Sequence, residues 1–96
     1  MLIRLEAIKK LIDKKMNVNT EITEDYWNGL RVHKIINPQT QESYCMLFAD
    51  VEIIHKDGKR FLSLEGIANG IVSINNQMLT PNEIQFLIKI NEGVNW

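Results

Sequence analysis

The fold is decided by residues 43–68, which read SYCMLFADVEIIHKDGKRFLSLEGIA. Two runs rich in β-branched, aromatic and other apolar residues flank the pair Asp57-Gly58. That pair suits the positive φ angles of a tight type I′ turn, so the stretch predicts a β-hairpin. We expect the other segments of the chain to pack on this hairpin.

The register of this hairpin follows by counting outward from the turn. One face then holds the pairs Ile53–Leu62, Val51–Leu64, Ala49–Gly66 and Leu47–Ala68. The other face holds the pairs Ile54–Phe61, Glu52–Ser63, Asp50–Glu65 and Phe48–Ile67. A shift of one residue would mix apolar and charged residues on both faces, which supports this register.

The composition is that of an ordinary globular domain. Hydrophobic residues make up 45% and charged residues 24% of the 96 residues, so neither disorder nor a fibrous class is indicated. A net charge of −1 gives no overall attraction to nucleic acid or to acidic membranes. The single cysteine, Cys45, excludes an internal disulfide and fits a reducing compartment. With no apolar run of about 20 residues and no signal peptide, we expect one cytoplasmic domain.

Residues 2–16 predict an amphipathic helix. Apolar residues recur at helical spacing, and basic residues occupy many of the other positions. The excess of basic residues has two interpretations: the solvated face of a helix docked on the sheet, or a contact for nucleic acid or a membrane surface.

The next segments predict further strands and turns. Residues 17–23 look like a connection with a short edge strand, and residues 24–29 like a turn that holds Tyr26 and Trp27. These two aromatic side chains either cover the edge of the core or anchor a partner. Residues 30–36 predict a strand, and residues 37–41 a polar loop. We expect Leu30, Val32 and Ile36 to share the core face with Cys45.

The C-terminal third predicts a short strand and a helix. Asn69-Gly70 is a second turn signal before a strand over residues 71–74, although residues 64–71 also fit helical spacing. Because Gly66 and Gly70 each cost about 1 kcal/mol in a helix, the strand is preferred. Thr80-Pro81-Asn82-Glu83 is a capping box that starts a final helix ending near residue 93. Trp96 either packs on the domain or is available to a partner.

Together these segments predict an α+β fold. A three- to four-stranded antiparallel meander is flanked by an N-terminal and a C-terminal helix, in the order α-β-β-β-(β)-α.

The second face of the predicted sheet carries the most interesting polar group. Asp50 lies opposite Glu65 with Glu52 nearby, and such like charges destabilise a sheet unless they are compensated. Arg31 and His33, from the neighbouring strand, supply the compensation. The group is then a solvated sheet face, a recognition surface, or a carboxylate and histidine site for metal binding or acid–base chemistry.

Basic residues gather at two further places, the first helix and the tip of the hairpin. They suggest a contact for phosphate groups, although charged residues also keep helices and turns soluble. The residues of this nucleic-acid interpretation are Lys9, Lys10, Lys14, Lys15, Lys56, Lys59 and Arg60.

No motif points to an enzyme. The sequence has no phosphate-binding loop, no glycine-rich dinucleotide turn, no paired cysteines, no HExxH and no GxSxG. We therefore expect a non-enzymatic binding or regulatory protein without cofactor or metal, acting on another protein or as a homodimer, with nucleic-acid binding as the alternative. The expected partner-binding residues are Tyr26, Trp27, Arg31, His33, Tyr44, Phe48, Asp50, Glu52, Glu65 and Trp96.

Overall fold

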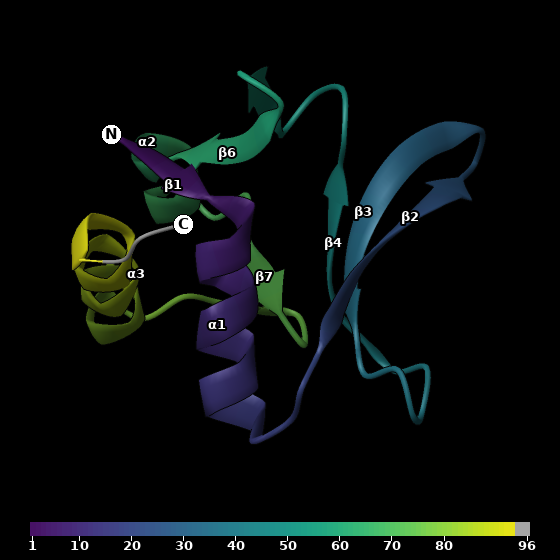
Figure 1. Ribbon diagram of the computed structural model, residues 1–96, viewed down its shortest axis with the longest axis horizontal. Helices are drawn as coiled ribbons and strands as arrows, with labels where there is room; N and C mark the ends of the chain where they lie inside the picture. The colour runs from purple at the N-terminus through teal and green to yellow at the C-terminus, as the bar shows by residue number, and fades with distance from the viewer. Residues whose placement is uncertain (94–96) are drawn as a thin grey trace.

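The computed structural model describes residues 1–93 and confirms the predicted α+β class with antiparallel sheets. Short strands lie before, between and after the first two helices of the described chain, and α3 is its last element (Figure 1). The elements are β1 (Leu2–Arg4), α1 (Leu5–Met16), β2 (Glu21–Trp27), β3 (Leu30–Ile36), β4 (Ser43–Phe48), β5 (Ile54–Lys56), β6 (Lys59–Ser63), α2 (Leu64–Ala68), β7 (Ser73–Ile74), β8 (Gln77–Met78) and α3 (Pro81–Gly93).

The strands form three antiparallel sheets within the described residues, with the orders β2-β3-β4, β1-β6-β5 and β7-β8. In Figure 1 the sheet β2-β3-β4 stands at one side of the molecule, and the helices lie on its other side. One hydrophobic cluster joins α1, the inner face of this sheet, β6, α2 and α3. No helix in residues 1–93 is long and apolar enough to span a membrane.

The N-terminal helix is shorter than predicted, because residues 2–4 form strand β1 and pair with β6. Helix α1 buries Leu5, Ile8 and Ile12 against the core, as its helical spacing predicts. It ends at Asn17, whose φ of 53° places it in the left-handed region that commonly terminates helices. The N–H of Asn17 donates to the carbonyl oxygen of Asp13.

The hairpin turn at Asp57-Gly58 is confirmed, but its arms are shorter than predicted. Both turn residues have positive φ, and Ile54 pairs with Phe61 as expected. The first arm is interrupted by a turn that separates β4 from β5, where Glu52 Oε1 accepts a hydrogen bond from the N–H of Phe48 at 2.9 Å. The predicted long pairing toward residue 68 is therefore wrong.

The preference for a strand after residue 63 is also wrong, because residues 64–68 form helix α2. Ser63 caps this helix, its Oγ accepting the N–H of Gly66 at 3.0 Å. A Cβ atom on Gly66 would lie 2.7 Å from Cδ1 of Ile71, so the absence of a side chain permits this close packing. The strand predicted over residues 71–74 is reduced to Ser73–Ile74, which pairs with β8 and not with the main sheets.

The predicted turn over residues 24–29 is mostly strand. Strand β2 continues to Trp27 and pairs with β3 along its whole length. The turn itself is Asn28-Gly29, with φ angles of 51° and 79° that match a type I′ hairpin.

The faces of β3 are exchanged relative to the prediction. His33 lies opposite Leu47 and Ile35 opposite Cys45, so His33 and Ile35 face the core. Val32 lies opposite Phe48 on the other face. A register shift between Ile35 and Ile36 accompanies this pairing.

The capping box before α3 is confirmed. Thr80 Oγ1 accepts the N–H of Glu83 at 3.2 Å, and Glu83 Oε1 accepts the N–H of Thr80 at 2.9 Å. Leu87 is buried, and Ile84, Phe86 and Ile90 pack against the core around it. The helix therefore docks through a broad apolar surface.

Candidate functional site

The outer face of the sheet β2-β3-β4 is the surface that carries Trp27, Leu30, Val32 and Phe48. These residues share one face because Val32 pairs with Phe48, Leu30 pairs with Trp27, and alternate residues of a strand point to the same side. In the view of Figure 1, no helix lies on this side of the sheet. Within residues 1–93, no helix therefore covers the outer face.

A small aromatic cluster lies on the outer face. The rings of Trp27 and Phe48 are 6.0 Å apart between centroids and meet edge to face at 61°. Val32 is completely buried, yet it does not belong to the main hydrophobic core. Its burial on a face without a helix indicates that the neighbouring side chains of this cluster shield it from water.

Large apolar side chains around this cluster remain in contact with solvent. Trp27 is 48% exposed, Leu30 53% and Tyr26 71%. Val51, in the turn that follows β4, is 83% exposed. That turn lies beside the start of β3, because the N–H of Ala49 donates to the carbonyl of Arg31 at 3.0 Å. The exposed apolar residues therefore concentrate at one end of the sheet.

Ion pairs border this end of the sheet. Arg31 Nη2 lies 2.8 Å from Asp50 Oδ1, and Arg31 Nη1 lies 3.9 Å from Glu24 Oε1. The hydrogen bond from Arg31 lowers the pKa of Asp50, and Asp50 in turn raises the pKa of the guanidinium. Both groups thus stay charged at neutral pH.

A second ion pair lies on the outer face itself. Lys34 Nζ is 3.2 Å from Asp25 Oδ2. The backbone N–H of Tyr26, which donates to Asp25 Oδ1, and then Lys34 lower the pKa of Asp25. Lys34 is therefore held by a carboxylate of the outer face, whereas Arg31, which alternates with Leu30 and Val32 and so points to the opposite face, is held by Asp50 and Glu24.

The predicted carboxylate cluster is only partly assembled. Arg31 and Asp50 meet as expected, but Glu65 belongs to α2 and does not lie opposite Asp50 in any strand pairing. Glu52 caps the turn after β4 through the N–H of Phe48. Within residues 1–93, no group of three or more His, Cys, Asp or Glu side chains is arranged to hold a metal ion.

Two residues expected on the recognition surface are buried instead. Tyr44 belongs to the hydrophobic core, and His33 is only 1% exposed because the faces of β3 are exchanged. Neither ring nitrogen of His33 has a hydrogen-bond partner in the described structure. Its ring centroid is 6.5 Å from that of His55, whose Nε2 contacts the carbonyl oxygen of Ala49 at 2.8 Å.

Burial is the main cause that lowers the pKa of His33 below its usual value of 6.5, and the nearby Arg60 adds to it. The imidazole is therefore neutral in the folded protein at physiological pH. The prediction for Trp96 lies outside the described residues.

Several basic residues of the nucleic-acid interpretation are engaged by carboxylates or rings. Lys9 Nζ lies 2.7 Å from Asp13, and Arg60 Nη2 lies 3.4 Å from Glu6. Lys56 and Lys59 lie opposite each other in the backbone pairing of β5 with β6, next to the hairpin turn. Nucleic-acid binding stays a prediction.

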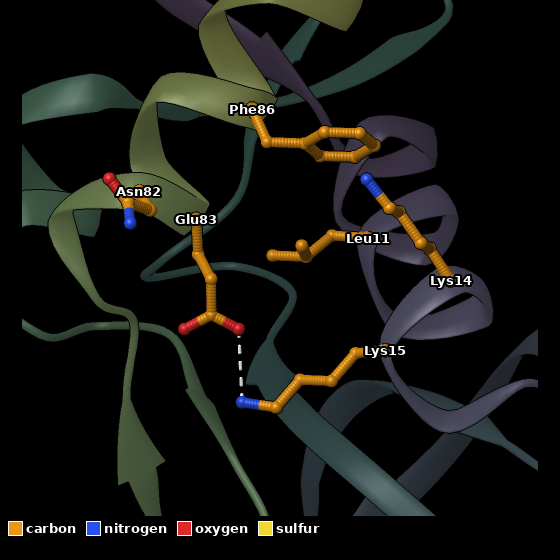
Figure 2. Close-up of a pocket in the computed structure, with 6 residues that line it drawn as sticks. All are labelled: Leu11, Lys14, Lys15, Asn82, Glu83 and Phe86. Atoms are coloured by element: carbon orange, nitrogen blue, oxygen red, sulfur yellow. Dashed lines mark ion pairs between the residues drawn. The ribbon is translucent and has the colours of Figure 1, made fainter.

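Figure 2 shows a pocket of about 300 Å³ between α1 and α3. Lys14 Nζ lies 4.4 Å from the centroid of the Phe86 ring, and Lys15 Nζ lies 3.0 Å from Glu83 Oε2. These charged groups thus contact residues of the other helix, and the pocket forms part of the packing between the helices. Its lining residues are Leu11, Lys14, Lys15, Asn82, Glu83 and Phe86.

No family model, no curated protein and no solved structure matches this chain.

Sequence reasoning identified Trp27, Tyr26 and Phe48 but missed Leu30 and Val51. The predicted register assigned Leu30 to the core face of β3, whereas in the structure Leu30 lies on the outer face with Val32. Val51 was placed within a long strand that is in fact a turn. The Asn28-Gly29 pair is a turn signal in the sequence that locates Leu30 at an exposed end.

Proposed function

We propose that this protein is a small, non-enzymatic binding protein of the cytoplasm that occupies a surface of another protein through the outer face of the sheet β2-β3-β4. The observation that carries the proposal is the Trp27–Phe48 pair, with Leu30 exposed beside it, on a sheet face that no helix covers. Aromatic side chains in such apolar centres supply most of the energy of protein–protein binding.

The surroundings of this apolar centre resemble the rim of an interface. The charged pair of Lys34 with Asp25 lies on the same face and remains accessible to water. Interfaces typically combine an apolar centre with a polar rim. A homodimer through the same face is the variant of this proposal that a measurement of molecular mass distinguishes.

The test is a pull-down from the lysate of the native host with wild-type protein and two matched variants. Leu30→Glu places a charge in the apolar centre. Met78→Glu makes the same change at a similarly exposed residue on β8. We expect wild type and the Met78 variant to retain the same protein at low and high salt and after nuclease treatment, and the Leu30 variant to lose it.

Equal retention by all three folded proteins contradicts the proposal. Capture of only salt-labile, nuclease-sensitive material supports the alternative, a nucleic-acid-binding regulator. Thermal melting of each variant verifies that the substitutions leave the fold intact.

A further inference from the structure

Strand β2 is an open edge of the sheet β2-β3-β4, since β3 is its only neighbour in the described structure. Across a two-residue hairpin turn, the two flanking residues exchange both backbone hydrogen bonds, and further along the strands hydrogen-bonded pairs alternate with pairs that are not hydrogen-bonded. Here Trp27 and Leu30 flank the turn and form a hydrogen-bonded pair. Asp25, two residues before Trp27, therefore also directs its backbone groups toward β3. The backbone groups of Ile22, Glu24 and Tyr26 then point away from the sheet.

Two observations support this assignment. The carbonyl of Arg31, which lies opposite Tyr26, accepts a hydrogen bond from Ala49 on the side away from β2. The N–H of Tyr26 donates to the carboxylate of its neighbour Asp25 at 2.8 Å. The same alternation leaves the N–H and C=O groups of Ile22 and Glu24 without a partner on β3.

This edge carries only one of the devices that usually prevent strand pairing. Proteins protect exposed edges with charged side chains, prolines, bulges or very short strands, and of these β2 has only charge, in the carboxylates of Glu21, Glu24 and Asp25. Strand β2 has seven residues, none of them lysine or proline, and its pairing with β3 shows no register shift. Strands β1 and β5, at the edges of the other three-stranded sheet, have three residues each.

The charge of this edge strand is acidic. Strand β2 carries the carboxylates of Glu21, Glu24 and Asp25 and no lysine or arginine. The basic residues of the neighbouring strand β3, Arg31 and Lys34, are already held by carboxylates. The edge strand itself therefore attracts positive charge.

This charge pattern disfavours a second copy of the chain as the occupant of the edge. Antiparallel pairing of the whole of β2 with its own copy centres on Glu24, so the two Glu24 side chains would lie directly opposite one another. Like charges in that position destabilise a strand pair. A segment with lysine or arginine at alternate positions would place positive charge near Glu24 or Asp25.

We propose that β2 binds an extended, basic segment of a partner protein as an additional strand of the sheet. The inference rests on the proposed function and names the chemistry of its partner. Main-chain hydrogen bonds to Ile22 and Glu24 supply affinity, and side chains on alternate positions supply specificity. On the outer face, the added strand runs beside Asp25 and Trp27, where a carboxylate and an aromatic ring both favour a cation.

The test is a selection from a phage-displayed library of random 12-residue peptides on the immobilised full-length protein. We expect the selected peptides to carry lysine or arginine at alternate positions around apolar residues. Binding of a synthetic selected peptide should slow amide hydrogen exchange at Ile22 and Glu24. Exchange at Tyr26, whose N–H is already bonded to Asp25, should change less.

Three variants identify the physical cause of the binding. Glu24→Pro removes an outward N–H donor and should weaken the selected peptide at least tenfold. The double variant Glu24→Gln/Asp25→Asn keeps the edge but removes two charges, and it should also weaken the peptide and reduce the salt dependence of binding. Glu92→Gln, an equally conservative change at an exposed position of α3, should leave the affinity unchanged.

Selected peptides without basic residues, or unchanged affinity in the folded double variant, overturn the inference. A dimer in sedimentation that Glu24→Pro dissociates also overturns it, because a second copy then occupies the edge. If Leu30→Glu still abolishes capture of the host protein while the edge variants retain it, only this inference fails. If Leu30→Glu also retains the host protein, the proposed function fails independently.

Discussion

The buried imidazole of His33 makes the stability of the folded protein dependent on pH. Burial and the nearby Arg60 lower the pKa of this side chain in the folded state. In the unfolded chain the imidazole returns to its ordinary value near 6.5 and takes up a proton first as the pH falls. The free energy of unfolding should therefore be constant above pH 6.5 with respect to this group and decrease below it.

The size of this effect has an upper limit that follows from proton linkage. If His33 stays neutral in the folded protein, acidification from about pH 7.5 to about pH 5.5 costs at most about 1.4 kcal/mol. The charged groups near the ring determine how much of this loss of unfolding free energy occurs. Arg60, Arg31 and His55 oppose the protonation of His33, and Glu24 favours it.

The substitution His33→Leu isolates this contribution. It removes a buried ring whose two nitrogen atoms have no hydrogen-bond partner in the described structure, and a buried polar group in that condition costs about 1–3 kcal/mol. We expect the variant to be more stable than wild type by about 1 kcal/mol at pH 7.5, after the cost of repacking, and by a larger difference at pH 5.5.

Urea unfolding followed by circular dichroism at both pH values provides the measurement. The contribution of titrating groups that lie away from His33 is common to both proteins and cancels in the difference. A difference between wild type and variant that is the same at pH 7.5 and pH 5.5 would refute the placement of His33 in the core.

Three further predictions follow from other parts of the structure. Gly66→Ala should lower the free energy of unfolding by about 1 kcal/mol, because its Cβ would lie 2.7 Å from Ile71 Cδ1 and 2.9 Å from the capping Oγ of Ser63, and this overpacking exceeds the helix propensity that alanine gains over glycine. Gly93→Ala, which meets nothing within 4 Å, should be neutral or stabilising, and thermal or urea unfolding measures both variants. Burial raises the pKa of Cys45 to about 12, so the folded protein should not react with a thiol reagent at pH 8, and rapid labelling without denaturant would contradict this. On a heparin column at about 0.15 M salt the protein should elute unretained, and strong retention that weakens steeply with salt would favour the nucleic-acid alternative.

Local signals in the sequence predicted the structure well, and long-range contacts did not. The Asp57-Gly58 turn and the capping box at Thr80 depend on neighbouring residues only, and both form as expected. In helix α2, the low helix propensity of glycine is outweighed by other interactions. The cost of Gly66 in a helix is real, but the Ser63 cap and the close packing with Ile71 favour the helix.

The extent of β2 and the faces of β3 depended on tertiary structure. Glu24 and Asp25 are poor strand formers, yet pairing with β3 along the whole of β2 holds them in a strand. The core face of β3 depends on its pairing with β4, which brings His33 opposite Leu47. No residue pattern in the loop between these strands specifies that register.

The recognition surface was predicted in part for the same reason. Trp27 and Phe48 were singled out as aromatic residues, but their contact depends on the register of three strands. The Asn28-Gly29 pair is a turn signal of the same kind as Asp57-Gly58, and it locates Leu30 beside them. An open strand edge cannot be read from one sequence, because it is defined by the absence of a neighbouring strand in the fold.

The most direct test of the proposed binding surface is site-specific photo-crosslinking in the native host. A photoreactive phenylalanine analogue replaces Leu30 in one protein and Met78 in another, since both positions carry exposed apolar side chains on different sheets. We predict that the probe at position 30 forms a covalent adduct with one protein partner and that the probe at position 78 does not. Equal adducts at both positions, or none at position 30 while the pull-down retains a protein, would contradict binding through the outer face.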